Sequence, residues 1–542
     1  MNKEYNFSIS TPKINRWEMR FINSILYSVL LFTLVIINLT TGKKLCIANI
    51  ESTYDYTEEI ISSKDQLSPQ NSQLKTHKLK PGTSNTILST RNPKLGTLNS
   101  KPETQVEDDI LEGFDNDKED IDNAINEVHE KPSIFSVSGN CKFGTSYNIA
   151  HHKPKDGETD WRGLSRARLE VELDLKMKFP NSWQSFISGI GIYDLIYFIK
   201  GRDEFTDDVL DNYEKEYEIG ELYLYGSLLE NIDIKTGRQI VVWGKSDNIR
   251  VTDVLNPLNM REPGMTDIED LRLPVTMTRL DYYIGDWNLS WIAIHEIRFN
   301  KNPEYGSDFY PSETPLPHEV KPAHSLGNTE FAAALNGIFS GWDVSFYWAD
   351  FYNDMTHMKT ASGASSQLQS ELEMRHTRLT MYGTAFNIAI GSILIKAEAA
   401  YFNGFKFLNS TDSSYSRTDI MAGIEYSGLS DTKISFEAVN RHINEFNNAL
   451  KNPPDNASEY EFQSVVRISR DFFNETLKAT ILASTFGWLG SDGAFQRLSI
   501  EYKVTDDIEI SGGVVFYKSG DLTIFNNIGD NDRFFIEIKY SF

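Results

Sequence analysis

Apolar and polar residues alternate with a period of two along most of the chain after residue 133. The segment 166–179 shows this pattern most clearly. Successive side chains of a β-strand point to opposite faces, so the segment has one apolar face and one fully charged face. The apolar face carries Ala167, Leu169, Val171, Leu173, Leu175 and Met177, and the charged face carries Arg166, Arg168, Glu170, Glu172, Asp174, Lys176 and Lys178.

Repetition of this alternation predicts about 18 strands, with 16 as the alternative count, for the region 133–542. Each segment is bounded by polar or glycine-containing stretches. The predicted strands are 134–141, 166–179, 184–198, 217–230, 232–244, 277–285, 288–298, 330–340, 342–353, 377–388, 391–405, 418–428, 432–441, 462–472, 475–487, 494–504, 507–518 and 533–542.

The connections between these segments are alternately very short and long. Tight turns are expected at Gly285-Asp286, Ser340-Gly341, Ser430-Asp431, Phe473-Asn474 and Thr505-Asp506. Short turns on one rim and long loops on the other are typical of an outer-membrane β-barrel, and an even strand count places both termini in the periplasm. A propeller would show a repeated blade motif, and a soluble sandwich would need shorter loops. The predicted fold class is therefore an all-β, transmembrane antiparallel barrel with a disordered N-terminal periplasmic segment.

The last predicted strand ends the chain on an aromatic residue. Phe534, Ile536, Ile538, Tyr540 and Phe542 share one face. A terminal Phe542 after alternating apolar residues such as Tyr540 resembles the C-terminal signal read by the outer-membrane insertion machinery. In lipid every backbone N–H and C=O must be paired within the protein, so the sheet has to close on itself.

The N-terminal 48 residues have the order of a secretory signal peptide. Basic residues, among them Lys3 and Arg20, precede an apolar run at 25–39, and a cleavage site is expected after Ala48. The alternative is an uncleaved membrane anchor, because the run is almost long enough to span a bilayer.

Residues 49–132 are predicted to be a disordered, low-complexity periplasmic linker. Ser, Thr, Asn, Lys and Pro dominate 62–102, and such a segment buries too little apolar surface to offset the entropy of ordering. Residues 103–130 contain twelve acidic residues and one lysine. Within this run, 110–115 is a small apolar island, interpreted either as a docking motif for a periplasmic partner or as part of a solvated acidic tail.

Charge and cysteine content exclude several classes of function. A net charge of −24 argues against nucleic-acid binding, because phosphates require basic partners. Of the two cysteines, Cys46 falls in the predicted signal peptide, so the mature chain has only Cys141 and no internal disulfide. His151 and His152 are adjacent, and adjacent strand residues point to opposite faces, so they do not chelate one metal together. No catalytic set stands out, and neither an enzyme activity, a cofactor nor a metal is expected.

The link between the predicted strands 232–244 and 277–285 is the most informative loop. Charges of both signs are interleaved with Val, Leu and Met, and three prolines stiffen it. A loop folded into the barrel would use the apolar residues to pack on the wall. Its charged residues would then meet acidic wall residues or an anionic solute. The alternative is an ordered extracellular loop held by internal salt bridges. The candidate constriction residues are Lys245, Asp247, Arg250, Asp253, Arg261, Glu262, Asp270 and Arg272.

A second candidate site lies on the predicted strand 166–179. Arg166 and Arg168 could form an anion-attracting row on the lumen wall. The alternative is that they pair with Glu170 and Glu172 on the same strand, and pairing of arginine with carboxylates is the more frequent outcome.

Several of these stretches together resemble a proteobacterial outer-membrane family, the domain of unknown function 1302. The resemblance extends over roughly 107–542 and is densest between 160 and 310. The stretches that carry it are Gly237-Arg238-Gln239-Ile240-Val241-Val242-Trp243-Gly244-Lys245-Ser246-Asp247, Asn256-Pro257-Leu258, Leu273-Pro274, Asp160-Trp161-Arg162-Gly163-Leu164-Ser165, Asp281-Tyr282-Tyr283, Ile294-His295-Glu296-Ile297-Arg298-Phe299 and Leu111-Glu112-Gly113-Phe114-Asp115.

The resemblance implies an outer-membrane barrel and carries over no catalytic residues. Members of the family accompany a periplasmic lipid-carrier-like protein and an exporter of the resistance-nodulation-division type, which implies movement of a hydrophobic molecule across the envelope. The leading hypothesis is therefore a channel or conduit for a hydrophobic or amphiphilic solute. Its expected partners are outer-membrane lipid, the insertion machinery, the lipid carrier and the exporter. A general diffusion porin and a surface-display or adhesin barrel without transport are the alternatives.

Overall fold

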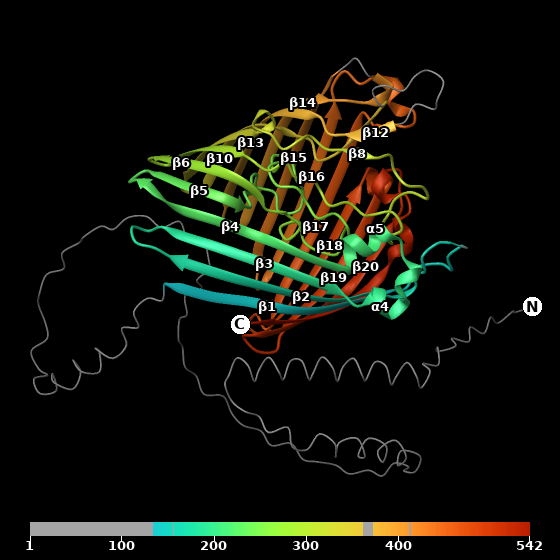
Figure 1. The fold of residues 1–542 in the computed structure, drawn as a ribbon. Coiled ribbons are helices and arrows are strands. Elements are labelled where there is room, and N and C mark those ends of the chain that lie inside the picture. The colour runs from blue at the N-terminus through green and yellow to red at the C-terminus, as the bar shows by residue number, and fades with distance from the viewer. Residues whose placement is uncertain (1–133, 156, 361–371, 411–413) are drawn as a thin grey trace, which may run out of the picture. The chain divides into compact units, whose positions relative to one another are not determined.

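The computed structural model describes residues 134–155, 157–360, 372–410 and 414–542. The predicted signal peptide (1–48) and linker (49–132) lie outside them. Eighteen antiparallel strands form one sheet, in which β1 pairs with both β2 and β21, so the sheet closes into a barrel (Figure 1). This confirms the strand count of eighteen. The wall strands are β1 (Phe135–Asn148), β2 (Gly163–Lys178), β3 (Gln184–Asp194), β4 (Lys215–Leu229), β5 (Ile232–Gln239), β6 (Val275–Ile284), β7 (Trp287–Ile294), β9 (Glu330–Phe339), β10 (Trp342–Tyr352), β13 (Arg378–Ile390), β14 (Ile393–Phe405), β15 (Tyr415–Leu429), β16 (Thr432–Ile443), β17 (Tyr460–Phe472), β18 (Leu477–Phe486), β19 (Gly493–Lys503), β20 (Ile508–Lys518) and β21 (Arg533–Ser541).

The smaller elements lie in the long connections between wall strands. A three-stranded sheet combines β8 (Glu319–Val320), β11 (His357–Thr360) and β12 (Leu372–Arg375). In the part of the chain that the structure describes, no helix is both long and apolar enough to cross a membrane. The helices and helical turns are α4 (Ile196–Lys200), η1 (Arg202–Glu204), α5 (Asp207–Val209), η2 (Leu210–Glu214), η3 (Leu326–Asn328), η4 (Leu408–Ser410), η5 (Asn448–Lys451), η6 (Trp488–Gly490), η7 (Thr523–Phe525) and η8 (Ile528–Asn531).

The two ends of the barrel wall meet on the rim of short turns. β1 begins where β2 ends, beside the turn into β3, and β21 ends beside the turn between β19 and β20. The backbones of Gly139 and Phe542 exchange two hydrogen bonds of 3.0 Å. A side chain at position 139 would collide with the Phe542 ring, so a glycine there lets the terminal aromatic lie on the first strand.

Alternate residues of each wall strand face opposite sides of the barrel. In β15, Ile420 is 60% exposed while its neighbour Met421 is 1% exposed. The outward residues of the wall are mostly large and apolar, which is the pattern of a barrel that faces lipid. In the last strand, Phe534, Ile536 and Ile538 are on this outward face, as their alternation predicts.

Four predicted strand ends differ from the structure by four residues or more, and the cause lies in tertiary contacts. β1 extends to Asn148 because β21 and β2 pair with its whole length. The predicted strand 184–198 ends at Asp194, whose side chain accepts hydrogen bonds from the backbones of Ala167 and Ile196 and precedes helix α4. The predicted strands 232–244 and 288–298 end at Gln239 and Ile294, because the following residues leave the wall for the barrel interior.

Candidate functional site

Residues 240–274, here named the lumen loop, connect β5 to β6 and lie inside the ring of strands (Figure 1). Both ends of the loop are held by Asn256, which is fully buried. The Asn256 side chain accepts a hydrogen bond from the backbone N–H of Val241 at 2.8 Å. It donates to the backbone carbonyls of Gln239 and Leu273 at 3.2 and 2.9 Å. The loop therefore leaves and rejoins the wall at one closed base.

Apolar side chains of the lumen loop pack on the inward face of the wall. Trp243 stacks on Tyr347 of β10 with ring centroids 4.7 Å apart. The inward wall residues that meet these side chains are themselves apolar and nearly inaccessible, so the contact is packed like the core of a soluble protein. The cluster joins Val241, Trp243, Ile249, Val251 and Leu255 of the loop to wall residues that include Met277, Ala349, Leu379, Met381, Met421, Val439 and Val465.

Two wall carboxylates bind the backbone of the lumen loop. Glu398 of β14 and Glu437 of β16 are 3% and 1% exposed. Glu398 accepts hydrogen bonds from the N–H groups of Lys245, Ser246 and Thr252 at 2.6, 2.8 and 3.2 Å, and from the Thr252 hydroxyl at 2.7 Å.

Glu437 completes this binding site for the loop. It accepts from the N–H groups of Asp247 and Asn248 at 3.0 and 2.9 Å, from the Ser246 hydroxyl at 2.7 Å and from the Asn248 amide at 3.2 Å. Hydrogen bonds to an ionised acceptor are stronger than neutral ones, so these two carboxylates fix residues 245–252 to one side of the barrel.

Ion pairs add to this attachment on the same side. Lys245 contacts Asp343 of β10 at 2.5 Å, and Asp247 contacts Lys396 of β14 at 2.7 Å. Lys396 is also within 4 Å of carboxylate oxygens of Glu425 and Glu437. The charges that this part of the loop presents are thus already paired with the wall.

The other end of the lumen loop is bound to a different part of the wall. Glu262 pairs with Arg166 at 2.9 Å and with Arg168 at 3.0 Å, both on β2. Asp267 pairs with Arg467 of β17 at 2.7 Å and with Arg497 of β19. The loop is therefore bound to β10, β14 and β16 at one end and to β2, β17 and β19 at the other, so it crosses the lumen.

The remaining candidate residues of the loop differ in their surroundings. Arg261 contacts Glu216 of β4 at 2.7 Å. Arg272 and Arg250 both contact Asp253, at 2.9 and 3.3 Å, so these three residues brace the loop internally. Asp270 is exposed.

The pairing expected within strand 166–179 is wrong in its partners. Arg166 and Arg168 contact Glu262 of the lumen loop, while Glu170 pairs with Lys142 of β1 at 2.9 Å and Glu172 accepts from Asn140 at 2.8 Å. The reason is that Glu262 contacts both guanidinium groups, while Glu170 and Glu172 are bound by Lys142 and Asn140 of the neighbouring strand β1.

A second long connection, 295–329, supports the lumen loop. The Asn300 side chain accepts from the Leu258 N–H at 2.6 Å, and Asn259 forms a backbone bridge with Lys301. Lys301 contacts Glu218 of β4 at 2.5 Å. Near this junction an apolar cluster fills the lumen beside β20 and contains Met265, Phe309, Val515, Tyr517, Phe525 and Ile528.

A cavity of about 200 Å³ remains between the lumen loop and the wall formed by β6, β7, β9 and β10. Its lining is largely polar. Asn288 has a buried amide nitrogen with no hydrogen-bond partner among the described residues, and cations from Lys245 and Arg279 reach the cavity already paired with Asp343 and Asp281. The cavity is lined by Val241, Val242, Trp243, Gly244, Lys245, Arg279, Asn288, Ser290, Ile292, Ala334, Asn336 and Tyr347.

The charge of Glu262 is set by its arginine partners. Burial alone would raise its pKa, but Arg168 and Arg166 outweigh burial and hold the pKa of Glu262 well below its usual range. A carboxylate with a lowered pKa contributes stability above its unfolded-state pKa and loses it only as pH falls towards the lowered value. The contact between Glu262 and β2 should therefore persist in mild acid.

We expect the Glu262→Gln substitution to loosen this end of the lumen loop. Arg166 would be left partly buried without its carboxylate partner, and Arg168 would keep only Asp194 at 3.4 Å, at a cost of about 2–4 kcal/mol for the docked state. Trypsin cleavage after Arg261, followed by mass spectrometry, should become faster in the variant. In the native chain it should stay slow from pH 7 to about 5. Glu172→Gln is the matched control, because Glu172 does not contact the loop; equal cleavage in both variants would contradict the assignment.

Sequence reasoning missed Glu398, Glu437 and Lys396. They stand in strands where outward neighbours are apolar, as in Ile395-Lys396-Ala397-Glu398-Ala399. A signal was present, because a charged residue at an inward position of an apolar strand requires a partner. The partner could not be named, since it comes from a loop about 150 to 190 residues away in sequence. Among the described residues, no group of three or more His, Cys, Asp or Glu side chains is arranged to hold a metal ion.

Three solved structures illustrate what the chain is similar to. OccK5 (OpdH) of Pseudomonas aeruginosa has 8% identity and a TM-score of 0.43 over 75% of this chain and 97% of its own. OccAB1 of Acinetobacter baumannii has 11% identity and a TM-score of 0.44 over 77% and 99%. A BenF-like porin from Pseudomonas fluorescens Pf-5 has 10% identity and a TM-score of 0.44 over 75% and 98%.

No curated protein matches the sequence. One family does: the sequence model described as "Protein of unknown function (DUF1302)" matches residues 155–542. This match begins shortly before β2 and includes the whole lumen loop, β21 and every strand between them. It covers well over half of the chain, so the protein belongs to the DUF1302 family.

Proposed function

We propose that the protein is an outer-membrane channel that conducts a hydrophobic or amphiphilic solute past a constriction formed by the lumen loop. The observation that carries this proposal is the attachment of the loop to different parts of the wall, through Lys245 and Asp247 at one end and Glu262 and Asp267 at the other. A barrel of 16 to 18 strands would otherwise leave an aqueous channel, so the loop determines what passes.

The location in the outer membrane is supported by the closed wall and its apolar outward face. Helices and closed barrels are the only folds that satisfy their backbone in lipid. We place the rim of short turns, and with it both termini, in the periplasm, because that is the orientation of bacterial outer-membrane barrels. The signal peptide and the insertion signal at Tyr540 and Phe542 belong to this proposal.

The hydrophobic character of the solute is supported by the composition of the lumen. Apolar inward residues of β6, β10 and β13–β18 pack against the lumen loop, beside the charged Lys396, Glu398 and Glu437 that bind it. A second apolar cluster with Phe309, Tyr517 and Phe525 lies beside β20. A periplasmic lipid-carrier-like protein and an inner-membrane exporter are the partners that such a solute would need, as the family resemblance implies.

One observation favours a second candidate, a general diffusion porin. The cavity beside Trp243 is polar, and polar residues that include Asn288, Ser290 and Asn336 line it. If this cavity continues through the barrel under membrane conditions, small hydrophilic solutes would cross without selectivity.

Conductance in planar bilayers separates the two candidates. The purified native chain should give a small or intermittent current, because the lumen loop blocks most of the cross-section. A large, steady and unselective current would contradict the constricted conduit and support the porin. Solute profiling in a deletion strain supplies the second measurement: export or uptake of an apolar compound should change. Unchanged flux of every solute would instead indicate a surface-display or adhesin barrel.

A further inference from the structure

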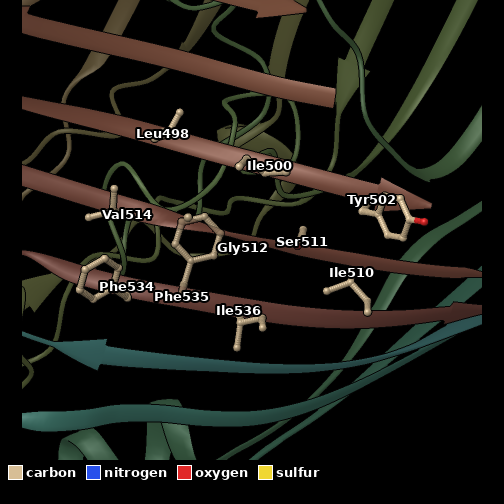
Figure 2. A pocket seen from close by; sticks show the side chains of 11 residues that line it. Leu498, Ile500, Tyr502, Ile510, Ser511, Gly512, Val514, Phe534, Phe535 and Ile536 are labelled. Carbon is tan, nitrogen blue, oxygen red and sulfur yellow. The ribbon is translucent and has the colours of Figure 1, made fainter. Parts of the chain in front are cut away.

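A hollow of about 510 Å³ lies on the outward face of the wall where β19, β20 and β21 run side by side (Figure 2). The hollow lies on the outward face because adjacent residues of a strand point to opposite sides of the wall. Arg497 contacts Asp267 of the lumen loop inside the barrel, so the adjacent Leu498 points to the outside, where it is 42% exposed. Ile536 is 53% exposed on the same face. The lining is formed by Leu498, Ile500, Tyr502, Ile510, Ser511, Gly512, Gly513, Val514, Phe534, Phe535 and Ile536.

The hollow exists because Gly512 interrupts a row of bulky outward side chains. Gly512 pairs with Ile500 of β19 on one side and with Ile536 of β21 on the other. The positions before and after it on the same face of β20 are Ile510 and Val514. On the inner side the next residue, Gly513, is covered by the ring of Phe535, because a side chain at 513 would lie within 2.8 Å of that ring. The wall is therefore sealed from within but recessed from without.

We propose that this hollow binds one acyl chain of a phospholipid from the leaflet on the side of the short turns. The inference rests on the proposed location in the outer membrane. Water is excluded from the hydrocarbon layer, and no side chain of the described residues fills the recess. An empty apolar cavity loses the contacts of its whole lining, so a mobile hydrocarbon chain is the occupant that the surroundings supply.

The hollow is short enough to lie within one leaflet. Along β19 it runs from Tyr502, next to the turn at the end of the strand, to Leu498. Four residues of a strand span about 13 Å, and a tilt of 35–45° reduces their depth to about 10 Å. One leaflet contributes about half of a hydrocarbon core roughly 30 Å thick. Tyr502 points its hydroxyl away from the hollow in Figure 2, at the end where an aromatic residue with a polar tip would meet the lipid headgroups.

Lipid retention measured by native mass spectrometry tests the proposal. The full chain is reconstituted into phosphatidylethanolamine–phosphatidylglycerol vesicles, extracted in mild detergent, and scored for phospholipids that remain bound. Gly512→Leu should fill the recess and remove one retained phospholipid per barrel. Val514→Phe narrows the same recess at the end opposite Tyr502. It provides a second variant if Gly512→Leu assembles poorly. Ala397→Leu is the control, because Ala397 is an exposed outward residue of β14 outside the hollow.

The outcomes separate this inference from the proposed function. Loss of one lipid in both hollow variants, with native retention in Ala397→Leu, supports it. Equal retention in the native chain and the hollow variants overturns it, provided that each protein inserts into the vesicles. Flotation of the vesicles, done before any lipid is counted, shows whether the native chain inserts. If it does not insert, the proposed outer-membrane location is contradicted, rather than the lipid site alone.

Discussion

Replacing residues 250–270 by a short Gly/Ser linker is expected to raise single-channel conductance at least about threefold, because an 18-stranded barrel without an infolded loop has a water-filled lumen. The deletion removes the larger part of the lumen loop, including Glu262 and Asp267, which bind it to β2, β17 and β19. Recordings in planar bilayers, with the native chain measured in parallel, give the comparison.

The control for this deletion is a shortening of the connection between β16 and β17. Leu450 of that connection packs on Tyr415 and Ile443 rather than on the lumen loop. Shortening it should leave the conductance at the native value. If the lumen-loop deletion produces correctly assembled barrels whose conductance is unchanged, the loop is not the constriction, and the proposed function loses the observation on which it stands.

Removing the carboxylate of Glu398 or Glu437 should release the first half of the lumen loop from the wall. Each carboxylate accepts four hydrogen bonds from residues 245–252. A hydrogen bond to a charged group contributes about 1.5–3 kcal/mol, and the contributions are not additive, so we expect Glu398→Ala or Glu437→Ala to destabilise the docked loop by about 3–6 kcal/mol.

Protease access measures this release. In the native chain Lys245 and Arg250 lie inside the barrel, so trypsin should cut after them slowly. The Glu398→Ala and Glu437→Ala variants should be cut at least about tenfold faster, because the expected loss of docking free energy makes the undocked loop more populated. The bilayer current should also fluctuate more. Glu501→Ala is the matched control, because Glu501 pairs only weakly with Lys478, at 3.9 Å, and does not contact the loop. Native cleavage rates in the two test variants would show that the loop is held by its apolar packing alone.

The two halves of the lumen loop are stabilised by different kinds of contact. Residues 240–255 combine an apolar face, with Trp243 and Val251 packed on the wall, with backbone groups bound by Glu398 and Glu437. Residues 258–267 depend more on charge, through Glu262 and Asp267. We therefore expect a raised ionic strength to weaken the attachment of residues 258–267 more than that of residues 240–255. The partial burial of these ion pairs limits the screening by salt.

The sequence by itself determined the wall of the barrel. Alternation with a period of two, as in 166–179, fixes which side chains face lipid and which face inward, because a strand allows no other placement. The order of short and long connections then gives eighteen strands and puts both ends of the sheet on one rim. The aromatic end of the chain was readable for the same reason, since Phe534, Ile536 and Phe542 repeat every second residue.

Only the tertiary structure decided what fills the barrel. The composition of 240–274 suggested a loop folded inward, but periodicity carries no information about partners distant in sequence. Glu262 meets Arg166 and Arg168 from about 95 residues away, and Glu437 binds Asp247 from 190 residues away. The hollow at Gly512 is also decided by the tertiary structure, because it arises where the pairing of three strands places their residues side by side. Local pattern specified the strands, and long-range pairing of charges, backbone groups and apolar surfaces specified the interior.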